Sequence, residues 1–237
     1  MADRPIVSLG LMMRIVAAFG VAPSTASEAN DTPWSAIIDL AEIQFDHDGQ
    51  LHWESAVYRS LGNGRLHLEI DGDGQSFSEI SGTQIQALYE RDILPGAAIW
   101  IGGEHDGGES PLNAVVVGAC VQASDSLYGE TSLFLDNRGR VFHQVKIIAS
   151  HAIGRYLYLE PRLVLDSSFQ NDRNGSIGAG PSNLSLALRL RLKRARGLAP
   201  YTGVKCATPV GRTATWIRAH AGNVRSCGAI AGFGARI

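Results

Sequence analysis

The stretch Arg65-Leu-His-Leu-Glu-Ile-Asp71 alternates strictly between polar and apolar side chains. In an extended strand, a period of two places Arg65, His67, Glu69 and Asp71 on one face and the leucines and the isoleucine on the other. Residues 184–193 repeat this pattern, with leucines opposite arginines, and residues 157–166 follow it as well. A soluble β-sandwich would also alternate, so the pattern predicts strands without choosing between a sandwich and a barrel.

Twelve segments of this kind can be placed after about residue 34, with no useful helical period between them. They span residues 36–46, 51–60, 64–71, 83–93, 97–106, 112–123, 127–136, 141–153, 155–168, 183–194, 199–208 and 224–236. Connections after even-numbered segments are tight, whereas several after odd-numbered ones are long, at 72–82, 107–111, 169–182 and 209–223. An even strand number with short turns at one rim is typical of bacterial outer-membrane barrels.

We therefore expect an all-β fold, a single antiparallel transmembrane β-barrel of about 12 strands with short periplasmic turns and longer extracellular loops. Its leucine faces would contact outer-membrane lipid, and its charged faces would line the lumen. The balance of 21 Lys and Arg against 23 Asp and Glu argues against a nucleic-acid partner. No stretch reaches the roughly 18 to 20 uncharged apolar residues of a membrane-spanning helix.

The N-terminus reads as a secretory signal peptide over residues 1–29, followed by the barrel domain over residues 30–237. Arg14 precedes the apolar run 15–22, and small residues follow through Ala29. Because Arg14 interrupts the apolar core read from Met1, translation would begin at Met12 or Met13. A buried N-terminal helix is the alternative. The signal peptide predicts export to the bacterial outer membrane.

Cysteine spacing predicts neither a zinc site nor a disulfide framework. The three cysteines, Cys120, Cys206 and Cys227, are an odd number without a C-x-x-C pair. Cys206 and Cys227 are expected on neighbouring strands, facing lipid as small apolar residues.

Several ordered motifs resemble the copper resistance protein B family. They are 42–74, Gln86-Ala-Leu-Tyr-Glu-Arg-Asp-Ile-Leu-Pro95, Ile101-Gly-Gly-Glu-His-Asp106, 177–191, Leu198-Ala-Pro-Tyr-Thr-Gly-Val204, Gly211-Arg-Thr-Ala214 through Ala221-Gly222, and Ala231-Gly232 in the last strand. The resemblance implies an outer-membrane barrel of a bacterial copper-resistance system that binds copper or moves it across the membrane. It also implies periplasmic copper-resistance proteins as partners. Three departures from the family are the lack of a Met-, His- and Asp-rich segment ahead of the barrel, Lys205-Cys206 in place of an acidic residue, and a C-terminal Ile237 in place of an aromatic one.

Copper ions would be cargo rather than a tightly bound cofactor, held by carboxylate and imidazole groups, which suit Cu(II) better than Cu(I). Strand pairing would bring His52 near Asp46, and Glu54 near Gln44 and Asp71, in an acidic mouth at the long-loop rim with His47, Asp48 and Asp73 close by. The candidate metal residues are Asp46, His52, Glu54, His67, Glu69 and Asp71. Further charges expected along the lumen are Glu42, Arg65, Glu104, Glu160, Arg162, Arg189 and Arg191.

Two alternatives remain open from the sequence. In the first, these carboxylates are ordinary lumen charges paired with arginines, and the barrel is a pore or structural element without a metal role. In the second, which the residues support least, the barrel is a lipid-acting enzyme. No arrangement of a nucleophile, a histidine and an acid stands out, so we expect no enzyme.

Overall fold

The computed structural model describes residues 36–46, 51–61, 64–76, 79–107, 111–173, 175–193, 198–220 and 225–236. The expected signal peptide lies outside these residues. Within the described part of the chain, no helix has the length and apolar character of a membrane span. Almost all of it is extended, as the period-two pattern predicts.

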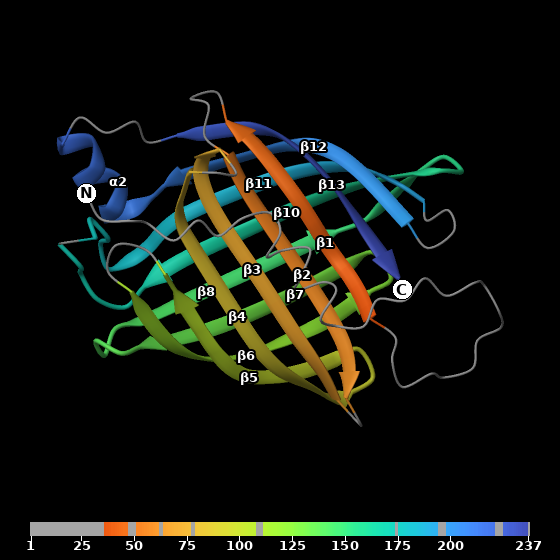
Figure 1. Cartoon of the computed structure of the whole chain (residues 1–237), viewed down its shortest axis with the longest axis horizontal. Helices are drawn as coiled ribbons and strands as arrows, with labels where there is room; N and C mark the ends of the chain where they lie inside the picture. The colour runs from red at the N-terminus through yellow and green to blue at the C-terminus, as the bar shows by residue number, and fades with distance from the viewer. Residues whose placement is uncertain are drawn as a thin grey trace.

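The first eight strands alternate in direction from one end of the barrel to the other (Figure 1). They are β1 (Ala36–Asp46), β2 (Leu51–Leu61), β3 (Gly64–Ser76), β4 (Glu79–Leu94), β5 (Ala97–Asp106), β6 (Leu112–Ser124), β7 (Leu127–Asp136) and β8 (Val141–Ala149). The remaining elements are β9 (His151–Ile153), β10 (Leu157–Ser168), β11 (Gly180–Leu192), β12 (Leu198–Pro209), helix α2 (Gly211–Ala219) and β13 (Ser226–Arg236).

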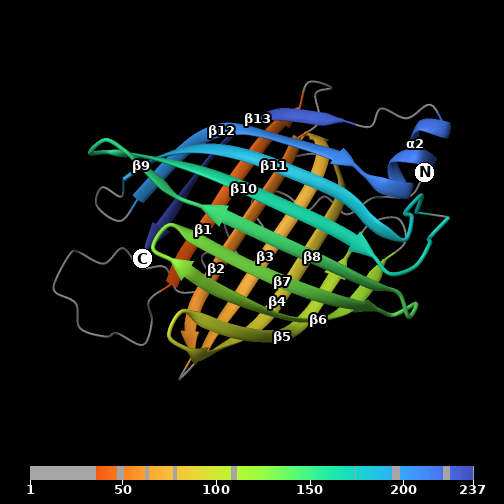
Figure 2. The ribbon, with the colours of Figure 1, turned by 180° about the vertical axis from the view of Figure 1, so that it is seen from behind.

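The sheet closes on itself as a barrel (Figures 1 and 2). Successive strands pair antiparallel, and β1 pairs with β13 to complete the ring. Strands β8 and β9 both pair with β10 and are separated only by Ser150, so together they form one interrupted strand of a twelve-strand wall. The structure thus confirms the expected antiparallel barrel, and the pairing of β1 with β13 removes the two long outer edges that an open sheet would have.

Two of the expected long loops contain regular structure. Residues 72–76 and 79–82 continue the β3–β4 ladder, with Gly72 opposite Thr83 and Asp73 opposite Gly82, so the loop expected over 72–82 is wrong. Glycine and aspartate usually indicate turns, but here these residues continue the backbone hydrogen bonding of the ladder that the flanking residues form. The segment expected as the loop 209–223 contains helix α2, which packs mainly on β11.

Alternation sorts side chains between the two faces of the wall. On β11, Leu186, Leu188 and Leu190 are exposed, whereas Ala187 and Arg189 between them are buried. Apolar side chains are exposed in the same way on the consecutive strands β5 to β8, as with Ile99, Ile101, Val115, Val117, Leu133 and Ile147. A contiguous apolar surface of this extent is typical of a lipid-facing barrel wall.

A small apolar cluster fills one side of the interior. Leu88, Trp100 and Val116 are buried together on β4, β5 and β6. Trp100 lies over its register partner Gly118, where an added Cβ would overlap the indole and lie 2.5 Å from the Thr131 carbonyl oxygen. A residue without a side chain is therefore required at position 118.

A disulfide joins Cys206 to Cys227, so the expectation of two unlinked cysteines is wrong. The two residues are register partners on β12 and β13, with a Cα–Cα distance of 4.1 Å. The spacing of the cysteines in the sequence does not indicate this bond, because the bond depends on the register between β12 and β13. Cys120 is the free cysteine of the described residues.

Candidate metal site in the barrel lumen

Two sizeable cavities occupy the interior of the barrel. One, of about 900 Å³, is lined toward the tight-turn rim by Leu94, Pro95 and Gly96. The other, of about 490 Å³, is lined toward the long-loop rim by His52 and Asp73. Five charged residues line both cavities: Glu54, Glu69, Lys146, Arg162 and Arg189. We call these five the mid-lumen layer, because a residue that borders both cavities lies between them.

Three carboxylates gather on one side of this layer. Glu54 on β2 is the register partner of Asp71 on β3, and Glu69 lies two residues before Asp71 on the same face. One oxygen from each carboxylate lies within 4.8 Å of the other two, and all three residues are partly buried. We call these residues the acidic trio.

An imidazole extends this group. His67 Nε2 lies 3.7 Å from Glu69 Oε2, and the His67 side chain is 12% exposed. The ring stacks on Tyr58, its register partner on β2, with 4.1 Å between ring centroids. His67 Nε2 makes no hydrogen bond within the described part of the chain. One imidazole nitrogen and several carboxylate oxygens are thus presented toward one another.

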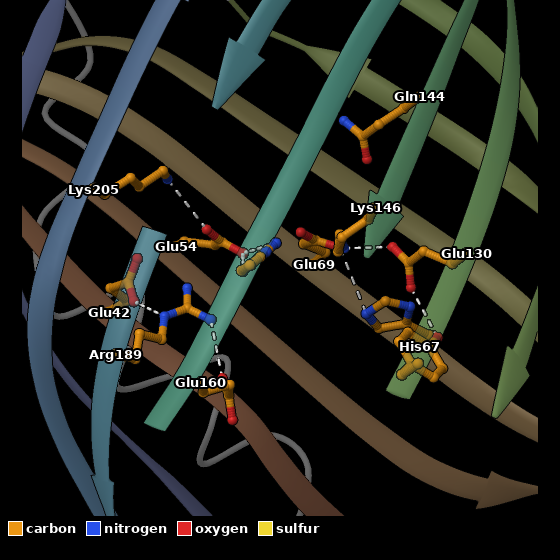
Figure 3. Close-up of polar contacts among 12 residues, drawn as sticks. Glu42, Glu54, His67, Glu69, Glu130, Gln144, Lys146, Glu160, Arg189 and Lys205 are labelled. Atoms are coloured by element: carbon orange, nitrogen blue, oxygen red, sulfur yellow. Dashed lines mark hydrogen bonds and ion pairs between the residues drawn. The ribbon is translucent and has the colours of Figure 1, made fainter. Parts of the chain in front are cut away.

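The opposite wall of the lumen is basic, and its cations reach toward carboxylates (Figure 3). Arg162 on β10 donates from both terminal nitrogens to Glu54 Oε1, each at 3.1 Å. Lys205 Nζ lies 3.6 Å from the other oxygen of Glu54. Glu54 therefore belongs both to the acidic trio and to an ion-pair network.

A second set of ion pairs lies beside the first. Arg189 Nε donates to Glu42 Oε2 at 2.8 Å, and both side chains are almost fully buried. Glu160 accepts from Arg191 at 3.3 Å and lies 3.5 Å from Arg189. The expectation that lumen carboxylates pair with arginines is confirmed for these residues.

Lys146 and Glu130 were not among the residues predicted from the sequence. Lys146 Nζ lies 2.5 Å from Glu130 Oε1, and Tyr128 donates a hydrogen bond to the other oxygen at 2.8 Å. The alternation of β8 contains the signal, since Gln144, Lys146 and Ile148 share the inward face.

The structure brings together four of the six candidate metal residues, namely Glu54, His67, Glu69 and Asp71. The expected partners across the β1–β2 hairpin are wrong by two residues. His52 pairs with Gln44 rather than Asp46, and Glu54 pairs with Glu42 rather than Gln44.

The remaining candidates lie apart from this group. His52 lines the long-loop cavity with its register partner Asp73. Asp46 lies at the end of β1 opposite Gly228. His47 and Asp48 fall outside the described residues, so the acidic mouth expected at that rim is not described as a whole.

Two further predicted lumen charges have local partners. Arg65 forms ion pairs with Glu90 and with Asp92, the latter at 3.1 Å, near the tight-turn rim. Glu104 accepts a hydrogen bond from Gln86 at 3.0 Å beside a small cavity of about 80 Å³. Neither residue reaches the acidic trio by a contact within the described residues.

Comparison with solved structures supports the fold. The chain is similar to the NanC porin, with a TM-score of 0.58 and 12% identity over 84% of this chain and 100% of the porin chain. It is also similar to the KdgM porin, with a TM-score of 0.51 and 14% identity over 85% of this chain and 98% of that one. At these identities the likeness shows the architecture of an outer-membrane porin and nothing of its cargo.

Sequence comparison identifies the family. The family described as copper resistance protein B precursor matches residues 32–236. A curated relative, the copper resistance protein B homolog of Pseudomonas syringae pv. tomato, is 25% identical over 184 residues, which are 77% of this chain. The chain spans 62% of the length of that relative. Because the family match extends over nearly the whole barrel, the chain belongs to the copper resistance protein B family.

Proposed function

We propose that the protein spans the bacterial outer membrane as part of a copper-resistance system and binds copper ions in its lumen. The family, the porin-like fold and the apolar outer face of the wall support this proposal. Copper is the cargo in this proposal, and its passage across the membrane would begin from the bound state. The proposal requires no catalytic step.

The acidic trio and His67 are the proposed copper ligands. The single observation that carries the proposal is that three carboxylates lie within 4.8 Å of one another, with a histidine nitrogen 3.7 Å from one of them. Carboxylate oxygen and imidazole nitrogen form a mixed set that suits Cu(II). Glu54 is held by Arg162 and Lys205, whereas Asp71 forms no ion pair within the described part of the chain, so binding at Asp71 needs no displacement of a cation.

A pore without a metal role is the second candidate, and a specific observation favours it. The lumen carboxylates Glu42, Glu54, Glu130 and Glu160 all have cationic partners. In that case the ion pairs would only brace the wall, and copper would show no preference over other divalent cations.

The deciding experiment is a titration of the refolded barrel with Cu²⁺, followed by calorimetry and by electron paramagnetic resonance. Zn²⁺ and Ca²⁺ serve as control ions. We expect saturable binding that prefers Cu²⁺, with a nitrogen coupling in the spectrum that the His67→Gln variant removes. Equal binding of all three ions would favour the pore without a metal role.

Variants then locate the ligands. The double variant Glu69→Gln, Asp71→Asn removes two carboxylates while keeping side-chain size, and we expect copper affinity to fall on the order of tenfold or more. Asp166→Asn is the matched control, because Asp166 lines the long-loop cavity, accepts hydrogen bonds from Gln144 and Asn183, and lies outside the trio. Equal affinity in the double variant and the control would refute the assignment of these ligands.

A further inference from the structure

One ion pair crosses the lumen from wall to wall. Arg162 on β10 and Glu54 on β2 are 108 residues apart in sequence, and both guanidinium Nη atoms donate to the same carboxylate oxygen. On the shorter way round the twelve-strand ring, β11, β12, β13 and β1 lie between these two strands. The two side chains therefore extend from nearly opposite walls, and we call their ion pair the transverse brace.

The brace lies where the interior is divided. Arg162 and Glu54 are both members of the mid-lumen layer, which borders the cavity of about 900 Å³ on one side and that of about 490 Å³ on the other. Both side chains are nearly buried, at 11% and 12% exposed. A solute that moves directly from one of these cavities to the other passes the mid-lumen layer, to which both side chains belong.

The same carboxylate belongs to the acidic trio. A copper ion that takes oxygens from Glu54, Glu69 and Asp71 competes with the Arg162 guanidinium for Glu54. We infer that copper binding breaks the transverse brace and opens the lumen to ions, so that the barrel has a copper-gated conductance. This inference rests on the proposed function, because it requires copper to bind at the trio.

The surroundings of Arg162 allow this exchange. Besides Glu54 and Glu69, which the copper ion would occupy, the guanidinium interacts electrostatically with Glu130 and Glu42, so a released Arg162 remains near negative charge. Lys205 Nζ is already 3.6 Å from the second oxygen of Glu54. Lys146 is held by Glu130 at 2.5 Å and does not bridge to β2. Release of the brace therefore leaves no guanidinium stranded without a carboxylate nearby.

The test is the ionic conductance of the refolded full-length barrel in a planar lipid bilayer, before and after addition of Cu²⁺. We expect low conductance without copper and a severalfold, saturable rise with Cu²⁺ that a chelator reverses. Ca²⁺ at the same concentration is the control for surface charge screening. Copper binding is followed on the same preparation by paramagnetic resonance, so that binding and opening are measured separately.

Arg162→Met removes the brace and leaves the acidic trio in place. We expect this variant to conduct without copper, to show little further rise when copper is added, and to keep the copper spectrum. Arg65→Met is the matched control, because the ion pair of Arg65 with Glu90 joins the neighbouring strands β3 and β4 and does not cross the lumen. Its conductance should stay low until copper is added.

The outcomes separate this inference from the function on which it rests. Copper binding without any change in conductance would overturn the gate and leave copper binding intact. An Arg162→Met barrel that conducts no better than the unmodified protein would also overturn it, because the brace would then not be what closes the lumen. Absence of copper binding would overturn the proposed function itself. A raised conductance of Arg162→Met would in that case show that the brace closes the lumen but that copper does not open it.

Discussion

The ion pair between Arg162 and Glu54 should contribute measurably to the stability of the barrel. Two charges 4 Å apart attract by about 1 kcal/mol in water and about 4 kcal/mol at an effective dielectric constant of 20. The pair is held by two contacts of 3.1 Å and is nearly buried, but it borders two cavities. We therefore expect a coupling energy of about 2 kcal/mol, between the value for exposed pairs and the 3–5 kcal/mol seen when buried pairs are broken.

The assay is a double-mutant cycle with Arg162→Met, Glu54→Gln and the double variant. Urea unfolding of the barrel in phospholipid vesicles, followed by tryptophan fluorescence, gives the free energy of unfolding of each form. The cycle is needed because Glu54 keeps Lys205 as a partner at 3.6 Å when Arg162 is removed, and the single variants include that residual interaction. A coupling energy below about 0.5 kcal/mol, as for a surface pair, would refute the reasoning.

Three further predictions concern the wall and the rim. Gly118→Val should lower the free energy of unfolding in urea, because the new side chain overlaps the Trp100 indole on the neighbouring strand. Gly103→Ala, whose Cβ would meet no atom closer than 3.7 Å, should unfold like the unmodified barrel. An equal loss of stability in both variants would contradict this. Cys206 and Cys227 are 21 residues apart, and reduction of their disulfide should lower the free energy of unfolding by up to about 3 kcal/mol in the same assay. The variant with both cysteines replaced by serine should match the reduced protein, and its stability should not change when reductant is added. Burial at the rim raises the pKa of the Asp136 carboxyl, but hydrogen bonds from the following turn outweigh burial and lower this pKa below 3.8. The stabilising contribution of Asp136 is therefore full above that pH and is lost as pH falls through the lower pKa of the folded state. Hydrogen exchange of the turn should show this loss in the native protein and no such step in the Asp136→Asn variant.

The strands could be predicted from the sequence because each has a lipid-facing and a lumen-facing side. That contrast makes the period of two visible even in short segments such as 184–192. Leu61 pairs with Gly64, so only two residues connect β2 to β3, and this short connection fixes the register, which is why the pairing of Glu54 with Asp71 was predicted correctly. The connection 47–50 gives no such constraint, and the β1–β2 register was predicted two residues away from the observed one.

The network that crosses the lumen could not be predicted in the same way. The contact between Arg162 and Glu54 depends on the closure of the ring and on how far two side chains reach from strands that are not neighbours. Alternation shows only that both residues face inward. The disulfide was missed for a related reason, since it depends on the register of β12 and β13 rather than on cysteine spacing.

The shared lining of the two cavities has a thermodynamic consequence. Because the five residues of the mid-lumen layer border both cavities, a solute that binds one of these residues from one cavity would change the partners that the residue offers in the other. Such linkage is reciprocal, so the same free energy describes the effect of each occupant on the other. The binding equilibria of the two cavities would then be coupled. A binding titration from one face of the membrane would depend on whether the cavity at the other face is occupied.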